Sequence, residues 1–474
     1  MIISQADLLT GDLNRVVAWR GEKILYLLDF RKDIIALIEK LQTQNESRWA
    51  LCCEDSYLFA VGLFALIYSG KTPVILGHLR EALIKEQRAS FQGIITDLDL
   101  NIDDCQTITL KTEADTDTDT DTDENLDLLI NPDFILPKYP NHAHLILFTS
   151  GSTGHPKEII KTLAQMEEES QILAQHFGEK LIGSMIAATI SHQHLYGLSF
   201  RIFLPLALGL PFDARIIEYH EQLIPLTLNF NGLQKTLSLI TSPAFLKRLD
   251  VNVQIIACQF IVSSGGALPF EISQKTLRCL GKLPTEIYGS SETGIIAQRT
   301  SQVEQQLWNE LMPIKVTQGV GQLIKIKSPL FTEDSKDIIQ DKIEIIYEKN
   351  QVLGFNLLGR KDKIIKIEEQ RISLTNIETR LKSLEHVDDA IVLALSQGER
   401  IILGAVIVLN EEFFSQNINN MIDANLGAYF RKQLRAYLEP VALPKRWRFI
   451  KKLNYNEQSK LNYRELQGLF DEVC

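Results

Sequence analysis

Short apolar segments that suit buried strands alternate with longer, one-sided segments that suit helices along most of this 474-residue chain. The stretch from Leu51 to Leu76 predicts a buried helix followed by a strand at Pro73–Leu76. This alternation is typical of layered α/β folds, in which helices cover the faces of a sheet.

A strand and a helix are also predicted around residue 150. The run His144–Phe148 is short and apolar, which favours a buried strand. The helix that follows is expected to bury one face, which carries Leu163, Met166, Leu173 and Phe177. Gly178 is placed to end this helix, because glycine commonly follows the last helical turn.

The pattern changes after residue 360. Two apolar runs, Asp389–Leu395 and Ile401–Leu409, are separated by a short polar segment, which predicts a hairpin. A helix is expected at about residues 420–437, and the end of the chain is basic and irregular. We therefore predict an α/β domain over residues 1–360 and a small α+β domain over residues 361–474.

The composition is that of an ordinary globular protein, with 45% hydrophobic and 23% charged residues. No apolar run reaches the roughly 18 to 20 residues that cross a bilayer. The N-terminus also shows no basic segment followed by an apolar one, as a signal peptide would. We expect no membrane span and a cytoplasmic protein.

The net charge of −11 comes largely from one segment, Glu113–Asp127, which contains eight acidic and no basic residues. It includes an Asp-Thr repeat that is too polar to pack, so we predict a mobile surface loop. No uniformly basic face is visible, which argues against nucleic acid as a partner. Six cysteines without a CxxC pair and nine scattered histidines favour neither a zinc site nor a disulfide framework.

A loop of glycines and hydroxyl residues, TSGSTGHPK, follows the strand predicted at His144–Phe148. Glycines allow successive backbone N–H groups to point inward, and hydroxyls and a lysine add donors and charge, so the loop predicts phosphate binding. Pro156 separates the glycines from the lysine, which excludes the P-loop order of kinases and other NTPases. The predicted contacts are Thr149, Ser150, Gly151, Ser152, Thr153, Gly154 and Lys157.

Two further glycine-containing turns come later in the chain. The apolar segment Phe260–Pro269 contains Gly265 and Gly266, which would let the backbone approach a flat base closely. The segment Glu286–Gly294 reads EIYGSSETG and combines an aromatic ring with a carboxylate. An aromatic face can stack on a base, and Mg²⁺ prefers carboxylate and phosphate oxygens.

In this order, from about Leu51 to the end of the chain, the motifs resemble those of the adenylate-forming superfamily. That superfamily includes acyl-CoA synthetases, aryl-acid ligases, adenylation domains of peptide synthetases and luciferases. The resemblance implies ATP and Mg²⁺ as cofactors and a C-terminal domain that is mobile. It implies that Tyr288 stacks on adenine and that Glu292 is catalytic and binds the metal. The adenine and phosphate contacts it adds are Gly265, Gly266, Gly289 and Ser291.

The resemblance implies further roles in less regular motifs. The segment Ser191–Gly197 (SHQHLYG) sits where the family lines its acyl pocket, so His192 or His194 would lie over the carboxylate, and we select His192. Asp341 would bind the ribose, Arg360 the ribose or phosphate, and Asp362 would be the hinge. Lys460 matches the catalytic lysine of the C-terminal loop.

Three departures from the family pattern affect the functional interpretation: Gln340 precedes Asp341, Glu369 replaces a glycine that lines the thiol tunnel, and Ser459 precedes Lys460.

The resemblance implies activation of a carboxylic acid as its acyl adenylate, with transfer to a thiol. The acceptor stays open between CoA and an acyl-carrier protein, and Glu369 favours the carrier protein. The acid stays open between an aryl acid, as in ligases of aryl polyene pathways, and a fatty acid. A homologue that binds nucleotide or a partner without catalysis is the alternative.

Overall fold

The computed structural model describes residues 11–111, 140, 142–150, 156–232, 236–252, 256–318, 324–331, 341–349, 351–360, 364–367, 370–397, 400–411, 413, 423–435, 437–438, 440–454 and 461–471. The chain forms two compact units, Met1–Lys336 and Asp337–Cys474. The hairpin at residues 341–360 belongs to the second unit, whereas the predicted division assigns it to the first domain. The 360/361 boundary stays a prediction of where the small domain pivots, and the Asp-Thr repeat lies outside the described residues.

The first unit contains a six-stranded sheet with the order β6-β5-β3-β4-β7-β8. Its strands are β3 (Arg48–Cys52), β4 (Thr72–Ile75), β5 (Gly93–Thr96), β6 (Gln106–Thr109), β7 (His144–Ser150) and β8 (Pro156–Thr162). The strands from β6 to β7 are parallel to their neighbours, and β8 returns antiparallel to β7. The strands predicted at Pro73–Leu76 and His144–Phe148 are thus present as β4 and β7.

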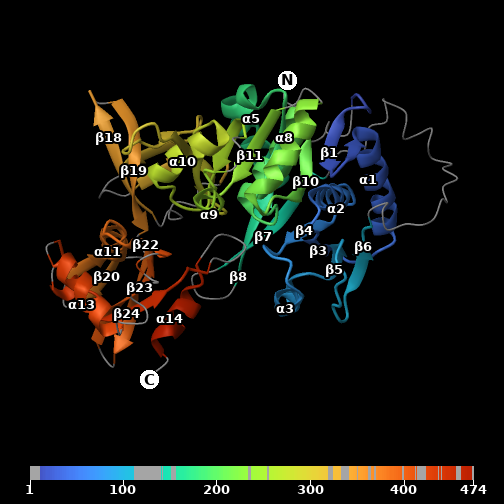
Figure 1. The fold of residues 1–474 in the computed structure, drawn as a ribbon. Coiled ribbons are helices and arrows are strands. Elements are labelled where there is room, and N and C mark those ends of the chain that lie inside the picture. The colour runs from blue at the N-terminus through green and yellow to red at the C-terminus, as the bar shows by residue number, and fades with distance from the viewer. Residues whose placement is uncertain are drawn as a thin grey trace. The chain divides into compact units, whose positions relative to one another are not determined.

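Along the chain, helix α2 (Ser56–Tyr68) connects β3 to β4 and α3 (Glu81–Glu86) connects β4 to β5, while α1 (Leu27–Gln42) packs against α2 (Figure 1). Helix α2 packs on β3, β4 and α1, and every residue from Ser56 to Ile67 is buried. This burial on all sides explains why its sequence shows no polar face. Asp55 caps the helix by accepting a hydrogen bond from the Leu58 N–H at 2.9 Å.

A nine-stranded sheet with the order β15-β14-β13-β12-β11-β9-β10-β1-β2 forms the rest of the first unit's main body. Its strands are β1 (Val16–Arg20), β2 (Lys23–Tyr26), β9 (Ser184–Ala188), β10 (Phe212–Ile216), β11 (Thr236–Thr241), β12 (Cys258–Ser263), β13 (Thr285–Ser290), β14 (Gly294–Thr300) and β15 (Asn309–Glu310). Strands β1 and β9 to β13 form a parallel centre, while β2, β14 and β15 pair antiparallel at the two edges. A separate antiparallel pair, β16 (Lys315–Gln318) and β17 (Ile324–Lys327), follows.

Helical segments connect these strands. They are α5 (Leu163–Leu181), α6 (Leu195–Gly197), the π-helix η4 (Leu198–Phe203), α7 (Leu204–Leu208), α8 (Leu223–Gly232), α9 (Pro243–Lys247) and α10 (Phe270–Leu280), with short 3₁₀ turns η2 (Arg88–Ser90) and η5 (His220–Gln222). None of the helices that the structure describes is both long and apolar enough to span a membrane.

Helix α5 confirms the predicted buried face but not the predicted end. Leu163, Met166, Leu173 and Phe177 are all at most 2% exposed. The helix continues past Gly178 to Leu181, and the glycine with positive φ (+77°) is Gly183, beyond the cap residue Ile182. At Gly178 an added Cβ would meet Leu208 at 3.5 Å, an ordinary van der Waals contact. The helix therefore ends later than the sequence predicts, before the glycine that adopts the left-handed conformation.

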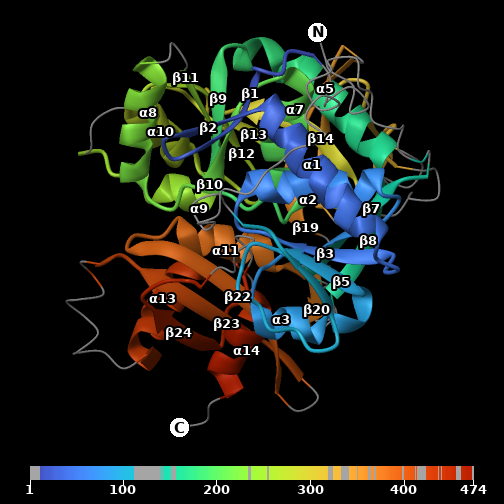
Figure 2. The ribbon, with the colours of Figure 1, turned by 90° about the vertical axis from the view of Figure 1, so that its right-hand side faces the viewer.

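The second unit is built around the sheet β22-β23-β24 (Figure 2). Its elements are β18 (Asp341–Glu348), β19 (Gln351–Arg360), β20 (Ile364–Ile367), β21 (Gln370–Ser373), α11 (Leu374–Lys382), β22 (Val387–Gln397), β23 (Arg400–Leu409), α13 (Asp423–Leu434), η9 (Pro440–Ala442), β24 (Arg446–Ile450) and α14 (Tyr463–Asp471). Helices α11 and α13 share one apolar cluster with the sheet, and α14 shares another. Alternate residues of β22 enter the two clusters, with Val392 in one and Leu393 in the other, as the period of a strand requires. The predicted hairpin and α+β character are present.

Candidate active site

In the parallel part of the nine-stranded sheet, β11 and β12 end side by side, and β13 continues past them. Thr241 at the end of β11 is in register with Ser263 of β12, and Ser263 is in register with Glu286 of β13. Ligands of open α/β sheets bind outside the carboxyl ends of the strands. The turn after β12 therefore lies beside the middle of β13, and the two predicted motifs meet at this edge of the sheet.

Side-chain hydrogen bonds fix these strand ends relative to their neighbours. The Ser264 hydroxyl donates to the carbonyl of Ile287 at 2.8 Å and joins the turn after β12 to β13. The Tyr196 hydroxyl lies 3.1 Å from the carbonyl of Thr241 and 3.0 Å from that of Val262. It thereby attaches the segment Ser191–Gly197 to the ends of β11 and β12. Burial raises the pKa of Tyr196, so this hydroxyl keeps its proton.

The predicted phosphate loop joins two antiparallel strands. Thr149 is paired with Lys157, and Ser150 with Pro156, across β7 and β8. The sequence predicts a helix directly after this loop, but β8 intervenes before α5 begins at Leu163. In β8 the side chains alternate, with Ile159 buried and Ile160 exposed, as the pleat of a strand dictates. The described residues on either side of the loop therefore pair as two strands, and the helix begins only after β8.

Glu292 lies in the turn between β13 and β14, called the Glu292 turn from here on (residues 289–294). Ser290 and Thr293 close it by reciprocal bonds: Ser290 N–H to Thr293 Oγ1 at 3.1 Å, and Thr293 N–H to Ser290 Oγ at 3.2 Å. Gly294 has φ of +70°, a conformation that a residue with Cβ adopts only at a cost. The turn thus has a defined shape, and the Glu292 side chain is 28% exposed.

Two lysines of β8 approach Glu292 from the six-stranded sheet. Lys157 Nζ lies 3.9 Å from Glu292 Oε1, longer than a hydrogen bond, so the carboxylate still has room for another ligand. Lys161 Nζ donates to the Glu292 backbone carbonyl at 3.0 Å. Burial lowers the pKa of Lys161, and the nearby carboxylates of Glu169 and Glu292 oppose that effect. The two sheets are therefore joined at the candidate metal ligand.

Tyr288, the predicted adenine contact, is half-buried at the end of β13. Its ring lies 5.8 Å from that of Trp308, at an angle of 57°. Trp308 is in turn covered by the Arg299 guanidinium at 4.6 Å, and Arg299 forms an ion pair with the buried Glu286 at 2.7 Å. This chain of contacts supports the Tyr288 ring and leaves part of it exposed.

His192 is completely buried, with 0% exposure. Its Nε2 lies 2.8 Å from the carbonyl of Cys53, which only accepts, so the ring proton is assigned to Nε2. Its Nδ1 lies 3.3 Å from the Ser56 hydroxyl, and the ring packs on Phe59 at 4.3 Å. Burial lowers the pKa of His192 well below its usual value, so the ring is neutral. Both nitrogens are engaged inside the protein, and we do not retain His192 among the proposed catalytic residues.

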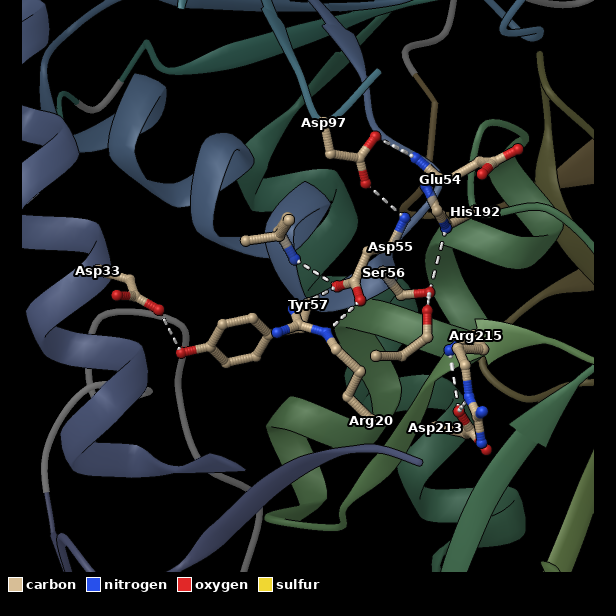
Figure 3. A network of polar contacts seen from close by, with 12 residues as sticks. Arg20, Asp33, Glu54, Asp55, Ser56, Tyr57, Asp97, His192, Asp213 and Arg215 are labelled. Carbon is tan, nitrogen blue, oxygen red and sulfur yellow. Dashed lines mark hydrogen bonds and ion pairs between the residues drawn. The ribbon is translucent and has the colours of Figure 1, made fainter. Parts of the chain in front are cut away.

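A buried polar network surrounds this histidine (Figure 3). The Ser56 hydroxyl also lies 3.0 Å from the carbonyl of Ala214, so its single proton is shared between that carbonyl and His192 Nδ1. Arg20 forms a two-point ion pair with Asp55 at 2.6 and 3.0 Å. Asp97 accepts from the N–H groups of Glu54 and Asp55, both at 2.9 Å. The network joins the start of α2 to strands of both sheets and accounts for the position of His192.

A family model for AMP-binding enzymes matches residues 34–325, more than half of the chain. The chain belongs to the AMP-binding enzyme family. It is 27% identical to a 4-coumarate–CoA ligase of Halorhodospira halophila over 292 residues, which cover 60% of this chain and 70% of that ligase.

Solved structures share the fold of this AMP-binding family member over its length. ATP-bound MatB from Rhodopseudomonas palustris matches with a TM-score of 0.75 and 15% identity, covering 100% of this chain and 99% of MatB. The o-succinylbenzoate CoA synthetase MenE of Bacillus subtilis, in complex with its acyl-adenylate intermediate, matches with a TM-score of 0.71 and 15% identity. That alignment covers 99% of this chain and 97% of MenE. The layered α/β architecture with a smaller C-terminal unit, predicted from the sequence, is thereby confirmed.

The structure describes some of the remaining predicted residues of this family member, while others lie outside its described part. In the second unit, Asp341 and Arg360 are direct partners in the register of β18 and β19, so the chain brings these two together. Gly265, with φ of +90°, and Gly266 are both exposed after β12. Gly289 and Ser291 lie in the Glu292 turn. The residues that fall outside the described part of the chain are Gly151, Ser152, Thr153, Gly154, Asp362 and Lys460.

Two residues at this site have no counterpart among the sequence predictions: Lys161 and Glu169. Lys161 follows Ile159 by two positions, so the alternation of β8 places it on the buried side. Glu169 falls within the apolar stripe of α5 that contains Met166 and Leu173, and it is 3% exposed. A charged residue at a core position of a regular pattern is the signal that could have identified both.

Proposed function

We propose that this chain is an AMP-forming acid–thiol ligase, which activates a carboxylic acid with ATP and passes the acyl group to a thiol. The observation that carries the proposal is the partly exposed Glu292 carboxylate, held in a shaped turn beside Lys157 and next to the half-buried Tyr288 ring. Membership of the AMP-binding family and likeness to the 4-coumarate–CoA ligase support the same chemistry.

The residues present fit a magnesium ion bound with nucleotide phosphates. Glu292 offers a carboxylate that Lys157 does not saturate, and Mg²⁺ commonly takes one or two carboxylates together with phosphate oxygens. Glu292 would hold the ion, whose charge would neutralise the phosphates. Lys157, Thr149 and the loop between β7 and β8 would contact the phosphates, and Tyr288 would stack on the adenine.

In the first step, a carboxylate oxygen of the acid attacks the α-phosphorus of ATP. A new P–O bond forms, the bond to the bridging oxygen breaks, and pyrophosphate leaves. Because both reactants are anionic, the protein contributes mainly by positioning them and by neutralising charge. We assign this neutralisation to Lys157 and to Lys460, which the resemblance identifies as the catalytic lysine.

In the second step, a thiolate attacks the acyl carbon of the adenylate, and AMP leaves as the acyl C–O bond breaks. The thiol proton passes to solvent. We propose that the C-terminal domain pivots at Asp362 between the two steps, and that Asp341 and Arg360 contact the ribose and its phosphate. Asp362→Pro should spare pyrophosphate release and slow thioester formation; equal loss in both steps would contradict the pivot.

The acid and the acceptor are proposed as classes. We propose an aryl or fatty acid as substrate, and His194 as the histidine nearest its carboxylate, because His194 is half-buried whereas His192 is enclosed. For the acceptor, Glu369 in place of a tunnel glycine favours a carrier-protein thiol over CoA. The relation to a 4-coumarate–CoA ligase favours CoA, so both acceptors enter the test.

Acid-dependent pyrophosphate release tests the proposal. The purified protein is incubated with ATP, Mg²⁺ and a panel of aryl and fatty acids, with Glu292→Gln as the control variant. Release with one acid class, absent in the control, is the expected result. CoA or a phosphopantetheinyl carrier protein is then added, and thioester formation identifies the acceptor. ATP binding without release for any acid would favour the non-catalytic homologue.

A further inference from the structure

Two buried side chains of opposite charge lie against the Glu292 turn. Lys161 Nζ donates to the carbonyl of Glu292 at 3.0 Å. The Glu169 carboxylate lies under Gly294, the last residue of the turn, where its Oε2 would come within 2.5 Å of an added Cβ. Since Lys161 comes from β8 and Glu169 from α5, two elements outside the nine-stranded sheet hold this turn.

Lys161 is positioned by the same strand that carries Lys157. The two lysines are four residues apart in β8, so both point to the same face of the strand. Lys157 is largely exposed and faces the Glu292 carboxylate, whereas Lys161 is 3% exposed and contacts the carbonyl of the same residue. One lysine is thus available to a ligand, and the other is occupied by the backbone.

Glu169 is enclosed to the same extent, with 3% exposure. Its Oε1 accepts from the Ser199 hydroxyl at 2.6 Å, and its Oε2 lies where a Cβ on Gly294 would come within 2.5 Å. Leu330 would lie 2.9 Å from that same Cβ, so only glycine fits at position 294. Glu169 therefore packs directly under the turn, and its charge acts on Lys161.

Burying two charges is expensive unless each is paired and hydrogen-bonded. Here Lys161 is hydrogen-bonded to the carbonyl of Glu292, the residue that would bind the metal, and Glu169 lies under Gly294 of the same turn. We propose that Lys161 and Glu169 are positioning residues that fix the Glu292 turn, so that its carboxylate is preorganised for magnesium. This inference rests on the proposed function for the role of Glu292, but the fixed turn itself is a property of the protein alone.

Lys161→Met tests the proposal, because methionine keeps most of the length and removes the charge. Lys71→Met is the matched control: Lys71 Nζ also donates to backbone carbonyls, those of Gln44 and Glu46 at 2.9 and 2.8 Å, in a different part of the first unit. The first readout is amide hydrogen exchange of residues 289–296 without nucleotide. The second is the Mg²⁺ concentration that half-saturates pyrophosphate release.

Loss of a hydrogen bond from a charged group corresponds to about a tenfold change or more. We expect Lys161→Met to raise both the exchange rate of residues 289–296 and the half-saturating Mg²⁺ concentration about tenfold, and Lys71→Met to leave both unchanged. Lys161→Arg, which keeps a donor and the charge, should restore part of the difference. Exchange in Lys161→Met at the rate of the unaltered protein would overturn the proposal.

A lone buried carboxylate could unfold the Lys161→Met protein. The double variant Lys161→Met/Glu169→Gln removes both charges and keeps an amide oxygen that can accept from Ser199. We expect it to fold, with fast exchange in the turn and a raised Mg²⁺ requirement. A return of both readouts to the values of the unaltered protein would overturn the proposal, because Lys161 would then serve only to balance Glu169.

The two readouts also separate this inference from the proposed function. If the unaltered protein releases no pyrophosphate with any acid, the proposed function fails, while exchange of residues 289–296 still reports whether Lys161 holds the turn. If release occurs and exchange does not respond to Lys161→Met, only the positioning role fails.

Discussion

Two buried polar clusters lie beside the strand ends of the first unit, one under the Glu292 turn and one around His192. In the first, Lys161 and Glu169 are enclosed, but Glu292 itself is 28% exposed and lies 3.9 Å from Lys157. In the second, His192 is 0% exposed and both ring nitrogens lie within reach of protein oxygens. Both clusters fall in sequence motifs that suggest chemistry, yet only the first leaves a reactive group available to a ligand.

The comparison teaches that a motif residue has to be judged by its type and also by whether its polar atoms are still open to a ligand. A group with a polar partner on every side contributes to the position of its neighbours, whereas a group with an exposed, unsaturated charge can bind. The predictions below follow from assigning binding to Glu292 and support to His192.

The largest effect is expected at Glu292. Glu292→Gln removes the carboxylate charge and keeps the side-chain size, and Lys161 contacts the backbone, so the fold should persist. Loss of one charge-stabilising group from an active site costs about 10²- to 10³-fold in rate. Pyrophosphate release should fall by that factor, while urea unfolding stays nearly unchanged. A Glu292→Gln variant that is as active as the unaltered protein would contradict the assignment of metal binding to Glu292.

Lys460→Ala should produce a loss of the same order, about 10²- to 10³-fold in adenylation. The reason is that the resemblance assigns Lys460 to the charge that develops during the reaction. ATP binding, followed by calorimetry, should weaken much less than the rate of pyrophosphate release. Near-normal pyrophosphate release by Lys460→Ala would mean that the charges that assist the reaction come from the first unit and not from Lys460.

His192 should respond in stability, with a smaller effect on rate. His192→Leu removes the donor to the Cys53 carbonyl and leaves a buried acceptor unsatisfied, which costs about 1 to 3 kcal/mol of unfolding free energy. His192→Gln keeps an N–H at a similar reach and should lose less. Urea unfolding measures both variants, and pyrophosphate release per folded molecule should stay within about tenfold. A stable His192→Leu protein without adenylation would reverse the assignments of the two clusters.

The sequence predicts those parts of the molecule that depend on local pattern. The buried helix α2, strands β4 and β7, the buried face of α5 and the β22–β23 hairpin each follow from apolar periodicity within one segment. Strand β8 is missed because its buried side carries Ile159 and Lys161, and a lysine hides the alternation that defines a strand. The end of α5 is missed because two glycines lie near it, and only the backbone conformation shows that Gly183, with φ of +77°, follows the helix end.

The residues of the candidate site also fall into two groups, those that a contiguous motif predicts and those that depend on contacts between distant segments. The motif EIYGSSETG is contiguous, so Tyr288 and Glu292 can be recognised from the sequence alone. The partner of the Glu292 carbonyl is Lys161, which is 131 residues away in the chain, and no spacing rule connects the two. His192 is enclosed by residues near positions 53 to 59, more than 130 residues earlier. Whether a motif histidine is buried or exposed is set by such distant contacts, and the sequence therefore gives no physical ground for selecting His192 over His194.

The pH dependence of stability provides the finest test of the comparison. Because burial lowers the pKa of His192 below 6.5, the native ring stays neutral where the unfolded ring takes up a proton. The unfolded state then binds more protons, so this residue makes stability fall as pH drops below about 6.5, by about 1.4 kcal/mol per pH unit. His192→Gln lacks this contribution, so its deficit in unfolding free energy should shrink between pH 7.5 and 5.5. Other titrating groups are common to both proteins and cancel in the difference. A deficit that stays constant over this range would mean that the native ring accepts a proton as readily as an exposed one, and that His192 is available for chemistry after all.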